Sequence, residues 1–212
     1  MDVFLKTKTH STMKKSLLLA MLFATLGAAP AVAAPYVSGS IGLGFPGDYT
    51  ETESGTKYQT AFNLGVPVNA AVGYDFGTTR TEFAIGYQKY DVDTVTIDGT
   101  KYKASDYTDS ADGSAWTFMA NGYLDLSKGS DIEPYAMAGL GIASLKESAK
   151  ASGITVSTNQ SCFTWQLGAG LGFKLSKNLT GDFGYRYLKP TGMDNNGSMS
   201  MHNILAGVRY NF

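Results

Sequence analysis

The feature that most constrains this chain is a two-residue alternation of side-chain character. Near the C-terminus, Ile204, Ala206, Val208, Tyr210 and Phe212 alternate with Asn203, Gly207, Arg209 and Asn211, and Leu205 is an exception. Successive side chains of a strand point to opposite faces, so the pattern predicts a strand with one apolar, aromatic face and one small or polar face. The pattern recurs, and it predicts eight strands at 36–45, 66–76, 80–90, 115–126, 132–145, 161–174, 178–188 and 202–212.

The lengths of the strands and connections narrow the architecture. The predicted strands have 10 to 14 residues, whereas strands of soluble proteins average about 5–6 and a tilted strand needs about 9–11 to span a bilayer. Short connections at 77–79, 127–131 and 175–177 alternate with long ones at 46–65, 91–114, 146–160 and 189–200. This predicts an all-β fold: an eight-stranded antiparallel up-and-down transmembrane barrel with four long extracellular loops and three short periplasmic turns.

The size of the side chains decides which face of the strands points inward. The interior of an eight-stranded barrel is just wide enough for side chains to fill, so it accommodates glycine and small polar groups but not eight strands of aromatic rings. We therefore expect the aromatic face to lie against lipid and form two interfacial girdles. The predicted lipid-facing aromatics are Phe76, Tyr87, Trp116, Phe163, Trp165, Phe173, Phe183, Tyr185, Tyr187 and Tyr210.

The first 33 residues have the features of a secretory signal peptide preceded by an N-terminal extension. Lys14 and Lys15 precede the apolar run 17–26, and Ala31-Val32-Ala33 is a small-x-small cleavage site. We expect cleavage after Ala33, which divides the chain into residues 1–33 and a barrel domain at 34–212. Translation from Met1 and from Met13 both remain open.

Ionisable residues on the small or polar face predict a network inside the barrel. They are Asp75, Arg80, Glu82, Asp125, Glu133, Lys174, Asp182, Arg186 and Arg209. Unpaired charges in such a space would cost several kcal/mol each, so we expect ion pairs that plug the barrel. Asp182 and Arg209, on neighbouring strands, are the strongest single candidate pair, and an ion path through the barrel is the alternative.

Several function classes find little support in the sequence. The mature chain has thirteen basic and seventeen acidic residues, which argues against an electrostatic nucleic-acid binder. The single Cys162 cannot form an intramolecular disulfide and is expected to be a small buried residue, and no Cys/His spacing suggests a metal site. We expect no cofactor and no catalytic residues, because the one mature histidine, His202, lacks a nearby serine pattern for nucleophilic catalysis.

The second long connection, 91–114, is acidic and has two readings. Asp98-Gly99 between 92–97 and 100–103 predicts a protruding hairpin with a type I′ turn. Asp91-Val92-Asp93 hints at calcium, but the third ligand and the glycine of an EF-hand loop are missing. We expect the hairpin, whose free strand edge offers a place for a partner to pair.

Three segments resemble the small outer-membrane β-barrel proteins, namely the OmpA transmembrane domain, OmpX-like proteins and opacity-type surface proteins. They are the closing 208–212, the segment Pro134-Tyr135 to Gly141, and Gly168-Ala169-Gly170-Leu171-Gly172-Phe173. The resemblance implies that Tyr210 and the terminal Phe212 form the signal read by the barrel-assembly machinery. It also implies an outer-membrane location, periplasmic chaperones during biogenesis, and a bare barrel without a peptidoglycan-binding domain.

The sequence thus predicts a non-enzymatic surface barrel of the outer membrane. We expect a monomer surrounded by outer-membrane lipids and lipopolysaccharide, with an adhesin- or opacity-like role carried by the loops. The alternatives are a narrow porin-like channel, a lipid-modifying enzyme and a soluble lipocalin-like barrel.

Overall fold

The computed structural model describes residues 33–212 except 54, 107, 109, 152–153 and 193–197. The predicted extension and signal peptide fall on residues 1–32 and the cleavage boundary, so they lie outside the described residues apart from Ala33. Residues Ala34–Phe212 form one compact unit. Within the described ranges, no helix is long and apolar enough to cross a membrane.

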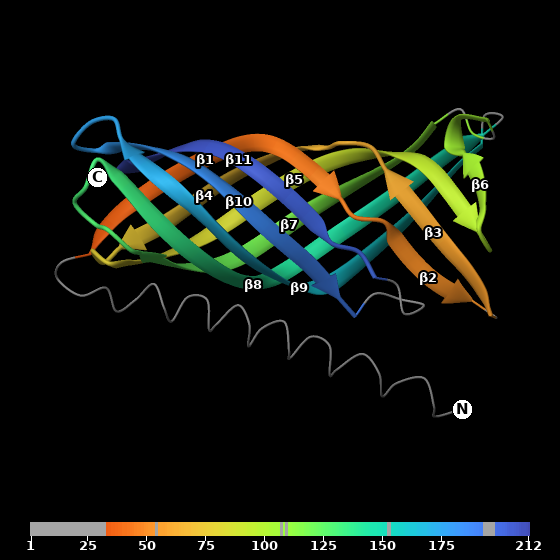
Figure 1. The fold of residues 1–212 in the computed structure, drawn as a ribbon, viewed down its shortest axis with the longest axis horizontal. Coiled ribbons are helices and arrows are strands. Elements are labelled where there is room, and N and C mark those ends of the chain that lie inside the picture. The colour runs from red at the N-terminus through yellow and green to blue at the C-terminus, as the bar shows by residue number, and fades with distance from the viewer. Residues whose placement is uncertain (1–32, 54, 107, 109, 152–153, 193–197) are drawn as a thin grey trace, which may run out of the picture. The chain divides into compact units, whose positions relative to one another are not determined.

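Eight strands form a closed antiparallel ring (Figure 1). In ring order they are β1 (Ala34–Pro46), β4 (Val66–Asp75), β5 (Thr79–Ile97), β7 (Ser110–Asp125), β8 (Ile132–Ala151), β9 (Ile154–Lys174), β10 (Leu179–Thr191) and β11 (Met201–Asn211). The first and last of them close the ring, with Val37 opposite Tyr210 and Phe45 opposite His202. Closure pairs the backbone groups of every ring strand on both sides. The predicted fold class is confirmed.

Three further strands and one short helix extend beyond the ring at the end opposite the short turns (Figure 1). They are β2 (Tyr49–Glu53), β3 (Thr56–Phe62), β6 (Thr100–Lys103) and the 3-10 helix η1 (Ala104–Asp106). β5 leaves β7 after the pair Asp91–Asp112, and its outer part, 92–97, then pairs with β3 and β6. We call this small sheet of β2, β3, residues 92–97 and β6 leaf A.

The outer parts of β7, β8 and β9 continue together on the other side of the opening. Their pairing runs without interruption from the ring to Ala151 opposite Ile154. We call residues 110–112, 147–151 and 154–158 leaf B. The predicted hairpin is confirmed, because Thr100 lies opposite Ile97 and the turn residues Asp98 and Gly99 both have positive φ, 47° and 86°.

The connections that we predicted as long loops are therefore largely strands. Apart from the confirmed hairpin within 91–114, the prediction of loops was wrong at 46–65, 91–114 and 146–160, where β2, β3, β6 and the extended parts of β5, β7, β8 and β9 lie. Outside the bilayer a strand need not keep one face apolar, so the alternation fades while the backbone ladder continues. Segments such as 146–150, with sequence Lys-Glu-Ser-Ala-Lys, then look like loop in the sequence.

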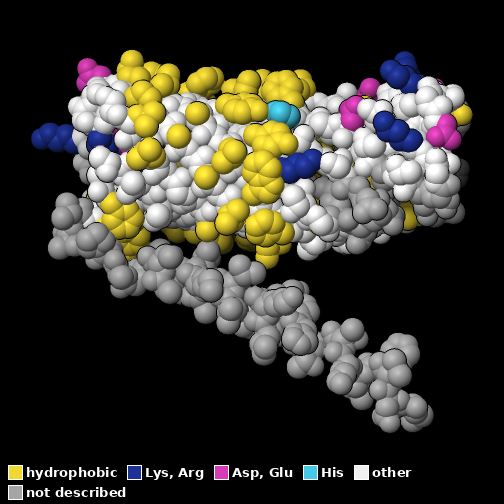
Figure 2. Space-filling model, turned by 60° about the horizontal axis from the view of Figure 1, so that its bottom comes forward, with side chains coloured by type: hydrophobic (Ala, Val, Ile, Leu, Met, Phe, Trp, Pro, Cys, Tyr) yellow, Lys and Arg dark blue, Asp and Glu magenta, His cyan; other side chains and the backbone are white. Residues whose placement is uncertain are grey.

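The predicted orientation of the strands is confirmed. Phe183 and Tyr185 are 53% and 44% exposed on the outer wall, whereas Gln166, one residue from Trp165, is 3% exposed inside. Half-buried aromatics on the wall pack against each other, as in the pairs Tyr87–Trp116 and Trp165–Tyr187 with ring centroids 4.8 and 5.5 Å apart. On the face shown in Figure 2, hydrophobic side chains form a band over the wall and most charged side chains gather near its ends.

Candidate functional site

The half of the interior nearest the short turns is filled by a charged and hydrogen-bonded network. Three hydrogen bonds join Arg80 of β5 and Asp125 of β7, with Nε 3.1 and 3.0 Å from the two carboxylate oxygens and a terminal nitrogen 2.9 Å from Oδ1. The Arg80 guanidinium also lies 4.3 Å from the ring centroid of Tyr123. Fork-like geometry and cation–π contact make this a strong pair in a space with little water.

A second part of the network centres on Asp75 at the end of β4. Its Oδ2 atom lies 2.7 Å from Lys128 Nζ and 3.6 Å from a terminal nitrogen of Arg209. Arg209 Nε lies 3.4 Å from Asp182 Oδ2, so the ion pair predicted from the sequence is present, although Arg80–Asp125 is shorter. Lys128, in the short turn between β7 and β8, was not predicted, because a turn residue gives no alternation from which to infer direction.

Glu82 is the centre of a third group, on the next level of the interior. It accepts hydrogen bonds from the hydroxyls of Tyr36 (3.0 Å) and Tyr123 (2.5 Å) and from the Asn121 amide (2.9 Å). Arg186 donates to the Tyr123 hydroxyl at 3.1 Å, which links β10 to this group across the interior. The Tyr36–Glu82 and Arg186–Tyr123 contacts join strands that do not pair directly, so they help to fix the cross-section of the barrel.

The structure brings together all nine ionisable residues that the sequence placed inside, with one difference in burial. Lys174 pairs with Glu133 at 3.3 Å, but its side chain is 39% exposed at the rim, because it is the last residue of β9. With Lys128 added, the network contains five acidic and five basic side chains. They are Asp75, Glu82, Asp125, Glu133 and Asp182, and Arg80, Arg186, Arg209, Lys128 and Lys174. The network is electrically balanced, which meets the condition for burying charge.

Tyrosine rings also lie inside the barrel, and those of Tyr36, Tyr90 and Tyr135, unlike that of Tyr123, lie opposite a glycine of the neighbouring strand. Tyr36 pairs with Gly73, Tyr90 with Gly113 and Tyr135 with Gly170. A Cβ atom added at Gly113 would lie 2.2 Å from the Tyr90 ring. The interior glycines thus leave space for rings rather than leaving the interior empty, a use that the alternation pattern does not reveal.

The other half of the interior is closed by apolar side chains, which we call the apolar plug. It consists of Tyr90, Ala115, Ala143, Leu145, Cys162, Leu188, Met199 and Met201, with Tyr49 and Phe62 packed against it. The predicted burial of Cys162 is confirmed, since it is 5% exposed. The plug was not predicted, although Leu188 and Met201 share the alternation register of inward-facing Arg186 and Asn203. The plug could have been predicted from the apolar residues that occupy inward-facing positions near the long connections.

The cavities inside the ring are small. One of about 20 Å³ is lined by Gln88, Met119 and Leu205, and one of about 40 Å³ by Ser38, Glu82 and Asp182, among others. Spaces of this size hold a few water molecules at most. Neither forms a continuous path through the barrel.

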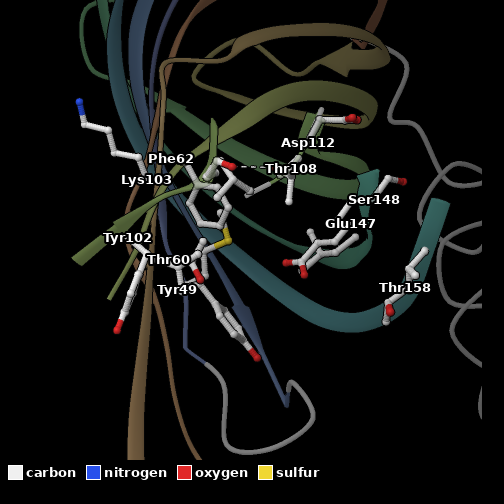
Figure 3. Close-up of a pocket in the computed structure, with 18 of the residues that line it drawn as sticks. Tyr49, Thr60, Phe62, Tyr102, Lys103, Thr108, Asp112, Glu147, Ser148 and Thr158 are labelled. Carbon is white, nitrogen blue, oxygen red and sulfur yellow. Dashed lines mark hydrogen bonds between the residues drawn. The ribbon is translucent and has the colours of Figure 1, made fainter. Parts of the chain in front are cut away.

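A larger cavity, of about 800 Å³, lies above the plug and between the two leaves (Figure 3). Phe62, Val95 and Ile97 line it from leaf A, Val156 lines it from leaf B, and Leu145 of the plug lines its floor. Its size is in the range of small-molecule sites, which are mostly apolar with a few polar groups. Val156, which contributes to this apolar lining, is 65% exposed at the far end of leaf B. It lies beyond the aromatic band, so contact with lipid does not explain an exposed apolar side chain there.

His202 lies on the outer wall and not at the cavity. Its Nδ1 is 2.6 Å from the Tyr185 hydroxyl, and its ring lies 5.1 Å from that of Tyr187. None of the contacts described for it involves a serine or a carboxylate. Within the described ranges no group of three or more His, Cys, Asp or Glu side chains could hold a metal ion.

Comparison with known proteins places this geometry in a family. The chain is 27% identical over 250 residues to an uncharacterized protein of Brucella abortus, which covers 86% of each chain. Among solved structures, it is similar to Neisserial surface protein A (TM-score 0.55, 22% identity, 85% of this chain and 99% of that one). It is also similar to the outer membrane protease OmpT from Escherichia coli (TM-score 0.53, 11% identity, 89% and 100%). Residues 16–212 match the outer membrane protein beta-barrel domain. The chain therefore belongs to the family of outer-membrane β-barrel proteins.

Proposed function

We propose that the protein is a non-enzymatic and non-conducting barrel whose two external leaves act in interactions at the surface of a Gram-negative cell. The observation that carries this proposal is the double closure of the interior, by the charged network in one half and by the apolar plug in the other. A chain that occludes its own lumen and continues its strands outward is built to display a surface.

The two alternatives receive less support from the geometry. A channel would need a continuous polar path, whereas the plug residues Met199 and Met201 are 2% and 1% exposed across the interior. A lipid-modifying enzyme would need a nucleophile and a base together, and His202 hydrogen bonds to Tyr185 instead. Since a protease shares the fold, the fold itself decides nothing about catalysis.

The proposed partners follow the two surfaces of the protein. Outer-membrane lipids and lipopolysaccharide would contact the aromatic wall, and Tyr210 and Phe212 would serve the assembly machinery. The leaves would contact an external partner. The predicted free edge lies on β6, which is only four residues long and carries Lys101 and Lys103. Short length and lysines protect an edge against pairing, so contact through the leaf surfaces is favoured over strand addition.

Two experiments test the proposal, one on the purified protein and one on intact cells. In planar bilayers the purified protein is expected to give no single-channel conductance, whereas stable conductance steps would overturn the non-conducting part. On intact cells, external protease is expected to cut within leaf A or leaf B and not within the ring. Binding of the cells to a host surface should fall with that cut, and unchanged binding would contradict the interaction role.

A further inference from the structure

The outer wall of the barrel carries a group of aromatic and basic side chains at its leaf end. Tyr187 of β10 lies directly opposite His202 of β11, and Lys189 of β10 lies directly opposite Trp165 of β9. The ring centroids of Trp165 and Tyr187 lie 5.5 Å apart, and those of Tyr187 and His202 lie 5.1 Å apart. We call these four residues and Tyr185 the wall cluster. In Figure 2 the cyan histidine lies among the hydrophobic side chains of the wall.

The polar atoms of the wall cluster include hydrogen-bond donors that are available to an external acceptor. His202 Nδ1 lies 2.6 Å from the Tyr185 hydroxyl. When this hydroxyl donates to Nδ1, the proton of the neutral ring is on Nε2, for which the described residues supply no acceptor. The Lys189 ammonium donates to Ser198 Oγ at 2.7 Å and has two further protons. Among the residues that the structure describes, no carboxylate forms an ion pair with Lys189 or His202. The wall cluster is therefore suited to an anionic acceptor.

The opposite side of the wall provides a comparison. There Tyr87 of β5 and Trp116 of β7 pack with ring centroids 4.8 Å apart, and Lys89 follows two residues further along β5. In the ring order these two strands lie across from β10 and β11. Lys89 lies 3.8 Å from the Asp112 carboxylate, which compensates its charge. Both sides thus have an aromatic pair with a lysine, but only the wall cluster adds a histidine and lacks a described carboxylate.

The outward residues of β10 follow the depth profile of a lipid. They run from Phe183, which is 53% exposed, through Tyr185 and Tyr187 to Lys189 at the leaf end. Acyl chains favour contact with an apolar ring, tyrosines gather at the level of the headgroups, and a lysine just above them attracts an anionic headgroup. The leaf end of the wall faces the outer leaflet, where the headgroup of lipopolysaccharide is a phosphorylated sugar.

We infer that the wall cluster is a binding site for the phosphorylated glucosamine headgroup of lipopolysaccharide. The phosphate accepts hydrogen bonds from the Lys189 ammonium and from Nε2 of His202. The apolar C–H face of the sugar packs on the rings of Trp165 and Tyr187. The inference rests on the proposed contact of the outer wall with lipopolysaccharide and names the side chains that make it, and it does not depend on the role proposed for the leaves.

A series of lipids tests which chemical group is recognised. The full mature chain in a nonionic detergent is titrated with diphosphoryl lipid A, with the same lipid after removal of its phosphates, and with phosphatidylglycerol. Bound lipid is counted by native mass spectrometry. We expect diphosphoryl lipid A to bind about tenfold tighter than the dephosphorylated lipid, which corresponds to about 1.4 kcal/mol. Equal affinity for these two lipids would overturn the inference, and phosphatidylglycerol bound as tightly as diphosphoryl lipid A would overturn the assignment to a sugar headgroup.

Variants assign the phosphate contact to the wall cluster. Lys189→Gln and His202→Phe each remove a donor but keep much of the side-chain shape, and each should weaken the binding of diphosphoryl lipid A about fivefold. Lys89→Gln, beside the aromatic pair on the opposite side, is the matched control and should leave this affinity unchanged. None of the three should alter the binding of the dephosphorylated lipid.

Heat-modifiable migration on gels verifies that each variant is folded. Wild-type affinity for diphosphoryl lipid A in the folded double variant Lys189→Gln with His202→Phe would contradict the site, as would an equal loss in Lys89→Gln. Either result would leave the expected absence of conductance and the accessibility of the leaves to protease untouched, so failure of this inference is distinguishable from failure of the proposed function.

Discussion

The two halves of the barrel interior are both filled by side chains, but the side chains differ in their chemistry. Near the short turns, ten charged side chains and several tyrosines are held at hydrogen-bond distances, as in the pair Arg80–Asp125. Toward the leaves, the same eight strands enclose methionine, leucine and alanine, with Met201 1% exposed. The stability of the charged network therefore depends on the direction and pairing of its groups, whereas the stability of the apolar plug depends on how well its side chains fill the volume. The two halves should therefore respond differently to substitution.

The largest loss of stability is expected from breaking the network. Arg80→Leu leaves Asp125 buried without its main partner, and removal of one member of a buried ion pair costs about 3–5 kcal/mol. The change in the free energy of unfolding is measured by urea titration in lipid vesicles, followed by heat-modifiable migration.

The double variant Arg80→Leu with Asp125→Leu separates pairing from packing. It should recover a large part of the loss, since replacement of a buried pair by apolar residues is often neutral. A double variant as unstable as the sum of the two single variants would mean that the pair contributes through shape and not through charge.

A smaller loss is expected from enlarging the plug. Met201→Ala should cost about 2–3 kcal/mol, at the lower end for such a change, because the flexible Met199 can move into the space. Unlike the loss in Arg80→Leu, the loss in Met201→Ala should not be restored by a second substitution at a charged position. If a charged replacement at position 201 were tolerated as well as alanine, the plug would be hydrated and the contrast between the halves would fail.

Substitution of the glycine in a tyrosine–glycine pair is expected to lower the free energy of unfolding by less than the changes above. Gly113→Ala brings a Cβ atom against the Tyr90 ring and should cost about 1–2 kcal/mol through overpacking. Gly122→Ala, on the same strand but with open space around it, is the matched control and should change stability much less. Equal effects of the two alanines would show that strand propensity, and not the ring, is responsible.

The smallest effect on stability is expected at the outer rim of the ring. Lys89 and Asp112 lie 3.8 Å apart with side chains 58% and 34% exposed, so Lys89→Ala should change the free energy of unfolding by less than about 1 kcal/mol. A loss comparable to that of Arg80→Leu would mean that the base of the leaves, and not the network, governs stability.

The sequence predicted the ring well and the regions beyond it poorly, for physical reasons. Between the two lipid interfaces, the bilayer forces one face of each strand to be apolar. The sequence therefore predicts that Phe183 faces the lipid and Asp182 the interior. Inside, the alternation separates Asp182 and Arg209 from the wall but does not say that Tyr135 fills the space above Gly170. In the leaves both faces meet water at least partly, and strands such as 146–150 lose the signal. Lys128 could not be found because its direction depends on the geometry of a turn.

The inward direction of the small and polar face is tested most directly by a cysteine scan along β9. In a Cys162→Ala background, single cysteines at 163, 164, 165, 166 and 167 are spin-labelled in lipid vesicles, and their collisions with oxygen and with a water-soluble nickel complex are measured. We expect high oxygen accessibility at 163, 165 and 167 and low accessibility to both reagents at 164 and 166. Oxygen accessibility at 164 and 166 together with nickel accessibility at 163 and 165 would contradict the account.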